Sequence, residues 1–462
     1  MNNNELQSIQ IKPLEYQSNL AKQLFSGIET LPWAMLLRSA SESHVDSRFD
    51  ILVAQPVATF ETTGQRTTIN VNENRVLQED PIISESDPFE LLHQYQQELI
   101  PDLNFEHDLP FVGGALGYFS YDLGRRVETL PELAEHDIKA PDMAVGLYDW
   151  AVIVDHKLKA ACVVGLNVEA RLAWLQEHSA GSQAPFSLIG EWQSNMSQES
   201  YVSKFDSVQE YLLSGDCYQI NLAQRFKAQY QGSEWQAYEK LEQYNSAPFS
   251  GFIRLEDCSI LSVSPERFLE LKDNTIETKP IKGTRPRSEE AQIDAEYAND
   301  LAHAEKDQAE NLMIVDLLRN DIGRVAKPGT VHVPKLFDIE SFPAVHHLVS
   351  TIRAELDEQY HATDLLRACF PGGSITGAPK VRAMQIIEEL EPHRRSAYCG
   401  SIGYISRHGR MDTSITIRTL VAEDQVLYAW AGGGVVADSD CQSEYQETLD
   451  KLSRILPVLA KD

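Results

Sequence analysis

Residues 264–287, SPERFLELKDNTIETKPIKGTRPR, are the stretch that decides how the fold is predicted. Two strand-like runs flank the turn-forming letters KDN, and this pattern predicts a β-hairpin. A hairpin centred on Asn274 would place the Glu266 carboxylate opposite the Lys282 amine, with Cβ atoms roughly 5 Å apart. From these residues alone, one interpretation is an ordinary salt bridge on the surface. The other is an acid and an amine that are placed for chemistry at the ends of two strands.

Residues 289–320, which follow the hairpin, have the pattern of one long helix. At about 100° per residue, Met313, Ile314 and Leu317 surround Glu310, which therefore lies within the apolar stripe. A carboxylate that faces the core needs a partner, because an unpaired buried charge is very costly. An arginine in a structural ion pair and a metal ion both meet that need, and the helical pattern does not decide between them.

Two glycine-rich segments lie further along the chain. Residues 370–380, FPGGSITGAPK, lead into a helix, and Pro379 suits its first turn. This segment is either an anion cradle or an ordinary tight turn, and it lacks the ending of a Walker loop. Gly432, Gly433 and Gly434 follow a strand-like run, which suits a close approach of the backbone to a ligand.

The last helix is predicted over residues 442–459. Its apolar side chains form one stripe, and Glu444 and Glu447 share the opposite face, one turn apart. Periodicity alone predicts that this acidic face is solvated.

A polar segment divides the chain. Residues 180–200 are rich in Ser, Gln and Gly and have few periodic apolar positions, so we expect a linker there. This predicts an N-terminal region, 1–190, and a second region, 197–460.

Composition limits the classes of function. The chain has 462 residues, and its formal charge of -29 argues against a nucleic-acid partner. No apolar run approaches the roughly 20 residues of a membrane span, and the start of the chain has no features of a secretory signal, so we expect a cytoplasmic protein. Six cysteines without a CxxC pair argue against a zinc site or a disulfide framework. An acidic protein that binds a small anion must concentrate cations, backbone N–H groups or a metal in one place.

The second half of the chain contains nine motifs in this order: SPERF, PIKGT, ENLMIVDLLRND, HLVS, FPGGSITGAPK, GSIGY, MDTSITIRT, AGGGVVADS and YQET. In this order they resemble the chorismate-utilising enzymes, which include anthranilate synthase component I, aminodeoxychorismate synthase component I and the isochorismate and salicylate synthases. A weaker match, LLRS at 36–39 and GGALGYFSYD at 113–122, extends into the first region. The resemblance implies an α+β fold in which large antiparallel β-sheets pack as a sandwich with helices on the outside.

The resemblance also implies a site for chorismate and Mg²⁺. Glu310 and Glu447 match the metal ligands of the family, with Glu444 beside them, so the acidic face of the last helix would look into a cavity. Mg²⁺ is a hard ion that accepts a few carboxylates and keeps waters. His347 matches a histidine near the ring, and a structural hydrogen-bonding role is an equal interpretation. The positions matched to substrate binding are Gly283, Thr284, Tyr404, Arg418, Gly432, Gly433 and Gly434.

The lysine in PIKGT resembles the aminodeoxychorismate-forming branch of the family, because anthranilate synthases usually read PIAGT. Isochorismate-type members carry a water-activating lysine at the position of Gln219, and glutamine cannot deprotonate water. In this branch Lys282 would add to C2 of chorismate while Glu266 protonates the departing C4 hydroxyl. Ammonia would then attack C4 and expel the lysine. Anthranilate synthesis is the alternative function, and a non-catalytic chorismate or tryptophan sensor is a more remote one.

The ammonia needs a source. The sequence has no GxCxG nucleophile segment with a downstream His-Glu pair, so the resemblance implies a separate glutamine amidotransferase subunit as partner.

The first region offers a second ligand. Relatives bind tryptophan near LLxS, either as a feedback inhibitor or as a structural ligand. Ser39 matches the serine of that motif, whereas Pro248 and Phe249 depart from the proline-rich segment that completes feedback pockets. We therefore expect structural binding of tryptophan rather than inhibition.

Overall fold

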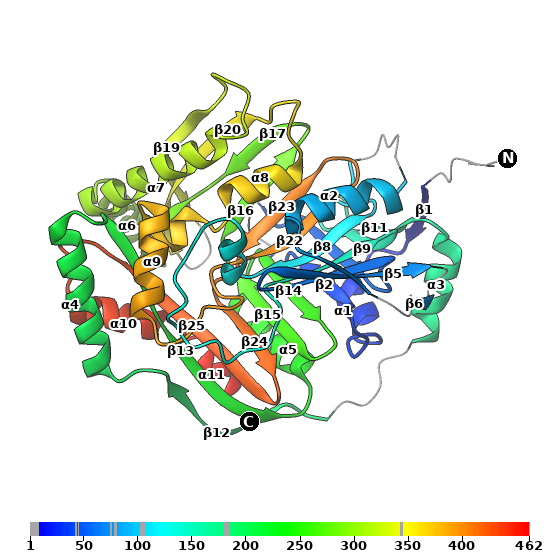
Figure 1. Cartoon of the computed structure of the whole chain (residues 1–462), viewed down its shortest axis with the longest axis horizontal. Helices are drawn as coiled ribbons and strands as arrows, with labels where there is room; N and C mark the ends of the chain where they lie inside the picture. Colours follow the sequence, from blue (N-terminus) through cyan, green and yellow to red (C-terminus); the bar gives the residue numbers. More distant parts are fainter. Residues whose placement is uncertain are drawn as a thin grey trace.

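The computed structural model of the chain contains two large antiparallel sheets, packed face to face with helices around them (Figure 1). This arrangement confirms the predicted α+β sandwich. The described residues are 9–41, 44, 46–73, 76–77, 81–101, 108–178, 184–341 and 345–461.

Within the described ranges, the first sheet has twelve strands and the second has thirteen. In spatial order the strands of the first sheet are β1 (Gln10–Leu14), β11 (Ala160–Gly165), β10 (Trp150–Asp155), β3 (Phe49–Val53), β2 (Met35–Arg38), β14 (Phe249–Arg254), β15 (Cys258–Ser264), β24 (Thr419–Glu423), β25 (Val426–Val435), β13 (Gln219–Gln231) and β12 (Ser187–Ser194), with β21 (Gly377–Ala378) beside β13.

In spatial order the strands of the second sheet are β18 (Ile281–Pro286), β20 (Val345–Glu355), β17 (Thr275–Thr278), β16 (Arg267–Lys272), β23 (Met411–Ile415), β22 (Ser401–Ser406), β8 (Gly114–Phe119), β9 (Met143–Tyr148), β4 (Ala58–Thr63), β5 (Arg66–Glu73) and β6 (Val76–Leu77), with β19 (His332–Ser341) beside β20 and β7 (Ile82–Ser84) beside β5.

Helices cover the outer faces of the sheets and one end of the molecule (Figure 1). The α-helices are α1 (Leu20–Phe25), α2 (Pro88–Leu99), α3 (Val168–Glu177), α4 (Gln198–Ser214), α5 (Glu234–Asn245), α6 (Ala291–Ala302), α7 (Glu305–Gly323), α8 (Ala362–Cys369), α9 (Lys380–Leu390), α10 (Cys441–Lys451) and α11 (Leu456–Leu459), and two 3₁₀ turns are η1 (Tyr121–Arg126) and η2 (Gly373–Ile375). Among the described residues, none of these helices has the length and apolar character needed to cross a membrane.

Both faces of the first sheet are buried. Ile51 points into the core between the sheets, where Phe60 of the second sheet also lies. Leu52, the next residue of β3, points to the other face and packs in a second core with Phe25 of α1 and Trp235 of α5. Because successive side chains of a strand alternate, this explains why the central strands are buried at nearly every position, as in β15 and β24.

The predicted hairpin forms, but its predicted register is wrong. Glu270 faces Glu277 and Lys272 faces Thr275, so the turn consists of Asp273 and Asn274 alone. Both turn residues have positive φ angles, 50° and 61°, as a type I′ turn requires.

The chain then leaves this hairpin at Pro280. Since proline has no backbone N–H to offer a strand partner, regular pairing with β16 stops before it. The next strand, β18, pairs with β20, and Lys282 faces Leu348 rather than Glu266. The two side chains are therefore not cross-strand neighbours.

Two predicted helices are each divided in the structure. The one expected over residues 289–320 is α6 and α7, and the one expected over residues 442–459 is α10 and α11. Helix α6 ends at Ala302, and the backbone N–H of the next residue, His303, bonds to carbonyls of the last turn.

The division into residues 1–190 and 197–460 stays a prediction. The polar segment 180–200 contains β12. Its first residues, 180–183, lie outside the described part of the chain. Both sheets take strands from both regions, because β2 pairs with β14 and β8 pairs with β22.

Candidate active site

Glu266 lies in the short connection between β15 and β16, where its carboxylate is held inside the protein. Its backbone N–H bonds to the Ser264 hydroxyl at 3.2 Å, and only 9% of the residue is exposed. Burial raises the pKa of Glu266 to about 7, while the nearby Lys282 amine, the Ser374 hydroxyl and Lys451 lower it. A carboxyl group with this pKa can carry a proton near neutral pH.

Lys282 approaches Glu266 from β18. Burial lowers the pKa of its amine, although Glu310, Glu266 and Glu447 raise it and Lys451 lowers it further. A lowered pKa increases the fraction of neutral amine, which is the nucleophilic form. The structure thus brings the predicted acid and amine into one cluster, by tertiary packing rather than by hairpin pairing.

Three glutamates stand on two helices at this end of the molecule, where Figure 1 shows α7 and α10. Burial raises the pKa of Glu310 on α7, Lys282 lowers it, and Glu444 is among the groups that raise it. On α10, Glu444 is 7% exposed and Glu447 is half exposed. The prediction from periodicity that this face is solvated is therefore wrong for Glu444.

The acidic side of α10 packs on Gly433 of β25. A Cβ atom at Gly433 would lie 2.9 Å from Glu444 Oε2 and 3.7 Å from Glu447 Oε1. Any side chain there would displace Glu444. The glycine predicted for close backbone approach therefore makes room for these carboxylates.

The donor set of Glu310, Glu444 and Glu447 fits a hard divalent cation, since all three offer carboxylate oxygens and converging carboxylates need a cation. The carboxylate oxygens of these three residues do not all lie within 4.8 Å of one another. Mg²⁺ suits such a set because it retains several waters.

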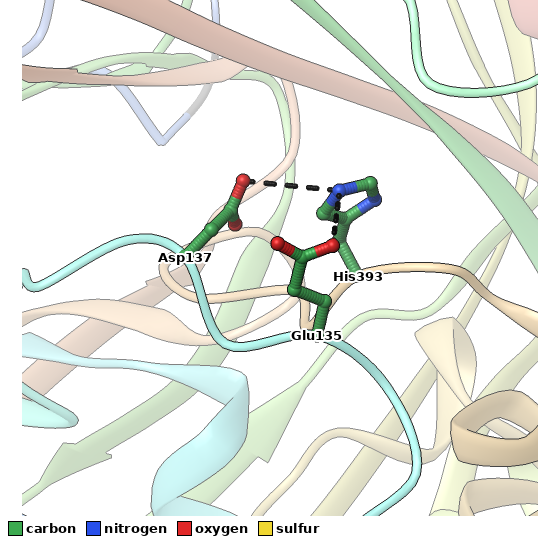
Figure 2. A group of neighbouring side chains, drawn as sticks. All are labelled: Glu135, Asp137 and His393. Carbon is green, nitrogen blue, oxygen red and sulfur yellow. Dashed lines mark ion pairs between the residues drawn. The ribbon is translucent and has the colours of Figure 1, made fainter.

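The compact group among the described residues is elsewhere, and consists of Glu135, Asp137 and His393 (Figure 2). Its ligand atoms all lie within 4.8 Å of one another. Asp137 is engaged by both terminal nitrogens of the buried Arg225 at 2.7 Å each. Its proximity to this arginine marks the group as an ion-pair cluster.

Arg418 brings a guanidinium cation to this site. Burial and the neighbouring Arg454 lower the pKa of its guanidinium. Its φ angle is +51°, in the left-handed region that is costly for a residue with a side chain. Within the described ranges, Arg454 is the charged group that influences Arg418 and no carboxylate does, so this partly buried cation suits an anionic ligand.

Backbone donors lie along β25. Strand β24 pairs with β25 only as far as Leu420 opposite Ala429, so Gly432, Gly433 and Gly434 extend beyond that pairing. On the other side the three glycines pair with β13. The unpaired side of this stretch offers N–H groups to a ligand.

His347, Gly283 and Thr284 form the neighbouring wall. Thr284 Oγ1 lies 2.9 Å from His347 Nδ1. Burial lowers the pKa of His347 to about 4, Gly283 raises it by a backbone hydrogen bond, and Arg418 lowers it. The imidazole is therefore neutral, and it stands close to Arg418. These four predicted residues lie together.

Lys451 is a residue of this site that sequence reasoning missed. Its Nζ is 2.7 Å from Glu447 Oε1 and donates a 2.7 Å bond to the Gly432 carbonyl. It also lowers the pKa of both Glu266 and Lys282. A signal was present, because Lys451 follows Glu447 by four residues on a helix.

Tyr404 lies in a different place. It lines a cavity of about 230 Å³ together with Ser39, Pro248 and Phe249. The charged groups that influence its hydroxyl are Asp412, Glu270, Arg267 and Arg410, none of which belongs to the Lys282 cluster. Contact between Tyr404 and the substrate stays a prediction that this placement does not support.

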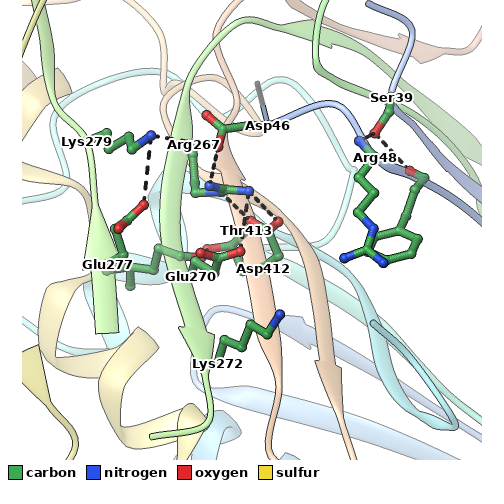
Figure 3. A network of polar contacts seen from close by, with 12 residues as sticks. Ser39, Asp46, Arg48, Arg267, Glu270, Lys272, Glu277, Lys279, Asp412 and Thr413 are labelled. Carbon is green, nitrogen blue, oxygen red and sulfur yellow. Dashed lines mark hydrogen bonds and ion pairs between the residues drawn. The ribbon is translucent and has the colours of Figure 1, made fainter. Parts of the chain in front are cut away.

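The same cavity holds a network of charges around Arg267 (Figure 3). Its guanidinium bonds to Asp412 twice at 3.0 Å and to Asp46 at 2.9 Å. Burial raises the pKa of Asp412 and Arg267 lowers it. On the opposite side, the Ser39 hydroxyl donates to the Phe49 carbonyl at 2.9 Å. The predicted tryptophan residues thus share one cavity, separate from the Lys282 cluster.

Comparison with known proteins identifies the family. The model of the chorismate binding enzyme family matches residues 34–457. The chain belongs to this family. Members of the chorismate-binding family with similar sequences include aminodeoxychorismate synthase component 1 of Escherichia coli strain K12, 57% identical over 97% of this chain and 98% of the relative. Anthranilate synthase component 1 of Thermus thermophilus is 35% identical over 93% of this chain and 92% of the relative.

Two solved structures share the fold of this chain. Anthranilate synthase component I from Streptococcus pneumoniae superposes with a TM-score of 0.76 and 31% identity, over 89% of this chain and 93% of that one. MenF, an isochorismate synthase from Escherichia coli, superposes with a TM-score of 0.73 at 14% identity, over 98% of this chain and 94% of that one. The sandwich is thus common to proteins whose names state different products.

Proposed function

We propose that the chain is the chorismate-binding component of an aminodeoxychorismate synthase, which converts chorismate and ammonia to 4-amino-4-deoxychorismate for p-aminobenzoate and folate biosynthesis. The observation that carries the proposal is the meeting of the Lys282 amine and the buried Glu266 carboxyl. The high identity to aminodeoxychorismate synthase component 1 over nearly the whole chain supports it.

The first step joins the amine to the ring. The neutral Lys282 nitrogen forms a bond to C2 of chorismate, the two ring double bonds shift, and the C4–O bond breaks. Glu266 gives its proton to the departing oxygen, which leaves as water, and Glu266 becomes a carboxylate.

The second step transfers the amino group from ammonia. Ammonia forms a bond to C4, the double bonds shift back, and the C2–N bond to Lys282 breaks, which restores the neutral amine. The new ammonium group on C4 returns one proton to the Glu266 carboxylate. Overall one hydroxyl is replaced by one amino group, and no pyruvate leaves.

Substrate binding would use the cation and donors of the site. Arg418 and the backbone N–H groups on the unpaired side of the Gly432–Gly434 stretch suit the carboxylate of the enolpyruvyl group. Glu310, Glu444 and Glu447 would hold Mg²⁺, which supplies charge neutralisation for the ring carboxylate. Lys451, which stands next to Glu447, adds a further positive charge for a dianionic substrate.

Ammonia would come from a separate glutamine amidotransferase subunit, in keeping with the designation component 1 that the relatives carry. Anthranilate synthesis is the second candidate. It is supported by relatives of lower identity, and the lysine of PIKGT argues for the first.

The proposal predicts the product of a simple assay. The purified chain, given chorismate, Mg²⁺ and ammonium, is expected to form 4-amino-4-deoxychorismate, detected by its mass. Chelation with EDTA should remove nearly all turnover and added Mg²⁺ should restore it, because the carboxylates then lack their cation. Glutamine should not replace ammonium unless the partner subunit is added. Anthranilate as product would establish the second candidate, and absence of turnover in every arm would leave a binding protein.

We also propose that the cavity around Arg267 binds tryptophan as a structural ligand. Its Phe249 ring can pack on an indole, and paired charges such as Arg267 and Asp412 match an amino acid that carries both charges. Calorimetry is expected to show binding of tryptophan and a higher melting temperature, with the turnover rate unchanged. The matched variant Phe249→Ala should lose the heat signal. Absence of heat and of any thermal shift in the unaltered chain would contradict this proposal.

A further inference from the structure

The segment 370–380 is held from both sides in the structure. The Thr376 hydroxyl donates to the Gly372 carbonyl at 3.1 Å, and the Thr376 carbonyl accepts from the backbone N–H of Asn221 at 2.9 Å. Arg395, 1% exposed, donates to the Ile375 carbonyl at 3.0 Å. These contacts fix the backbone on the C-terminal side of Ser374.

The N-terminal side is equally fixed. Lys380 Nζ reaches back to the Cys369 carbonyl at 3.0 Å and is ion-paired with the fully buried Asp321 at 2.5 Å. A Cβ atom at Gly373 would lie 2.4 Å from Leu317 Cδ2 of α7, so the backbone is in close contact with that helix. The segment is thus a rigid support rather than an open anion cradle.

This support presents one hydroxyl to the candidate active site. Ser374 Oγ donates to Glu266 Oε1 at 3.3 Å. Among the described residues, it is the side-chain hydrogen bond that the Glu266 carboxyl group receives. The remaining groups that face Glu266 are Lys282 from β18 and Lys451 from α10, with Cys399 also nearby.

We propose that Ser374 is a positioning residue that fixes which oxygen of Glu266 carries the catalytic proton. Because Oε1 accepts from Ser374, the proton resides on Oε2, the oxygen left free to face the substrate. The Oε2–H bond then breaks as the proton passes to the C4 oxygen, the C4–O bond breaks, and water leaves. This inference rests on the proposed function, since it concerns the acid of that reaction.

The variant Ser374→Ala tests the inference through rate and pH together. Without the Ser374 hydroxyl the Glu266 carboxyl is no longer held in one orientation, and kcat is expected to fall about tenfold. This is less than the loss of about 10²-fold or more expected when the general acid itself is removed. The hydroxyl also stabilises the carboxylate form, so its loss raises the pKa of Glu266. Glu266 then stays protonated to higher pH, so in the plot of kcat against pH the alkaline loss of activity shifts to higher pH. The ratio of the kcat of the variant to that of the unaltered chain should therefore increase with pH. Because ammonia titrates identically in both assays, its titration does not affect this ratio.

Matched variants separate positioning from packing. Ser374→Thr keeps the hydroxyl and should keep the profile of the unaltered chain. Ser401→Ala removes another buried serine hydroxyl, which donates to the Ser414 carbonyl at 2.9 Å, and should change neither kcat nor its pH dependence. If Ser374→Ala does not fold, Ser374→Cys, whose thiol is a weak donor, carries the same expectations.

Each outcome decides between the inference and alternatives. A slow Ser374→Ala enzyme with an unmoved pH profile means a packing role and overturns the inference. An enzyme with unchanged rate and profile also overturns it, provided that Glu266→Gln is impaired in parallel. Full activity of Glu266→Gln would instead refute the acid role in the proposed function itself.

Discussion

Replacement of Lys282 by alanine is expected to lower the formation of 4-amino-4-deoxychorismate by about 10³-fold or more, as is usual when a covalent nucleophile is removed. The reason lies in its surroundings, since burial lowers the pKa of this amine and provides the neutral form. Turnover with chorismate, Mg²⁺ and saturating ammonium measures the loss. Direct attack of free ammonia accounts for a small residual rate.

The variant Lys272→Ala is the matched control, because it removes another lysine charge from the same hairpin region. Lys272 lies at the exposed turn end of β16, where it is ion-paired with Asp108 at 3.3 Å. Lys272→Ala should keep the rate of the unaltered chain. Mass spectrometry of the unaltered enzyme quenched during turnover should locate a substrate adduct on the peptide that contains Lys282. A Lys282→Ala enzyme with full ammonia-dependent activity would exclude the covalent step.

The second large effect concerns Glu266. The variant Glu266→Gln should lose about 10²- to 10⁴-fold in kcat, because the amide cannot protonate the leaving hydroxyl. The rate should fall at every pH, in contrast to the shift of the alkaline loss of activity to higher pH that is expected for Ser374→Ala. A normal rate with ammonium would assign the proton donor to another group.

The same substitution should spare or improve stability. The pKa of Glu266 is raised to about 7 in the folded chain, above its ordinary value, so the folded state retains a proton that the unfolded chain releases. This contribution to stability is complete below the unfolded pKa and is lost as pH rises through about 7. The linked free energy is on the order of 3 kcal/mol, and glutamine has no such loss. Urea unfolding above neutral pH should therefore find Glu266→Gln at least as stable as the unaltered chain.

Much of the candidate site could be predicted from local pattern and motif order. Glu310 stood out because it interrupts an apolar stripe, and the structure does place it next to Lys282. The hairpin turn was visible in the letters KDN. Its register was not, because a turn that uses two residues and one that uses three differ only in backbone conformation.

What local pattern could not predict depends on distant partners. The switch of β18 to β20 brings Lys282 to Glu266, and no residue near either one encodes that pairing. The burial of Glu444 depends on Gly433, which lies on a strand rather than on the same helix. The motif predicts that Tyr404 contacts the substrate. In the structure its side chain instead lines the cavity around Arg267, because side chains alternate along β22.

The mixed origin of both sheets has a consequence for synthesis on the ribosome. When the first two hundred or so residues have emerged, the sequences of β2 and β8 have been translated, but those of their partners β14 and β22 have not. Each then has an open edge that can pair with another nascent chain. Because β22 comes late in the chain, the edge of β8 waits longer than that of β2. We expect protection of that edge by a chaperone to matter most during this interval.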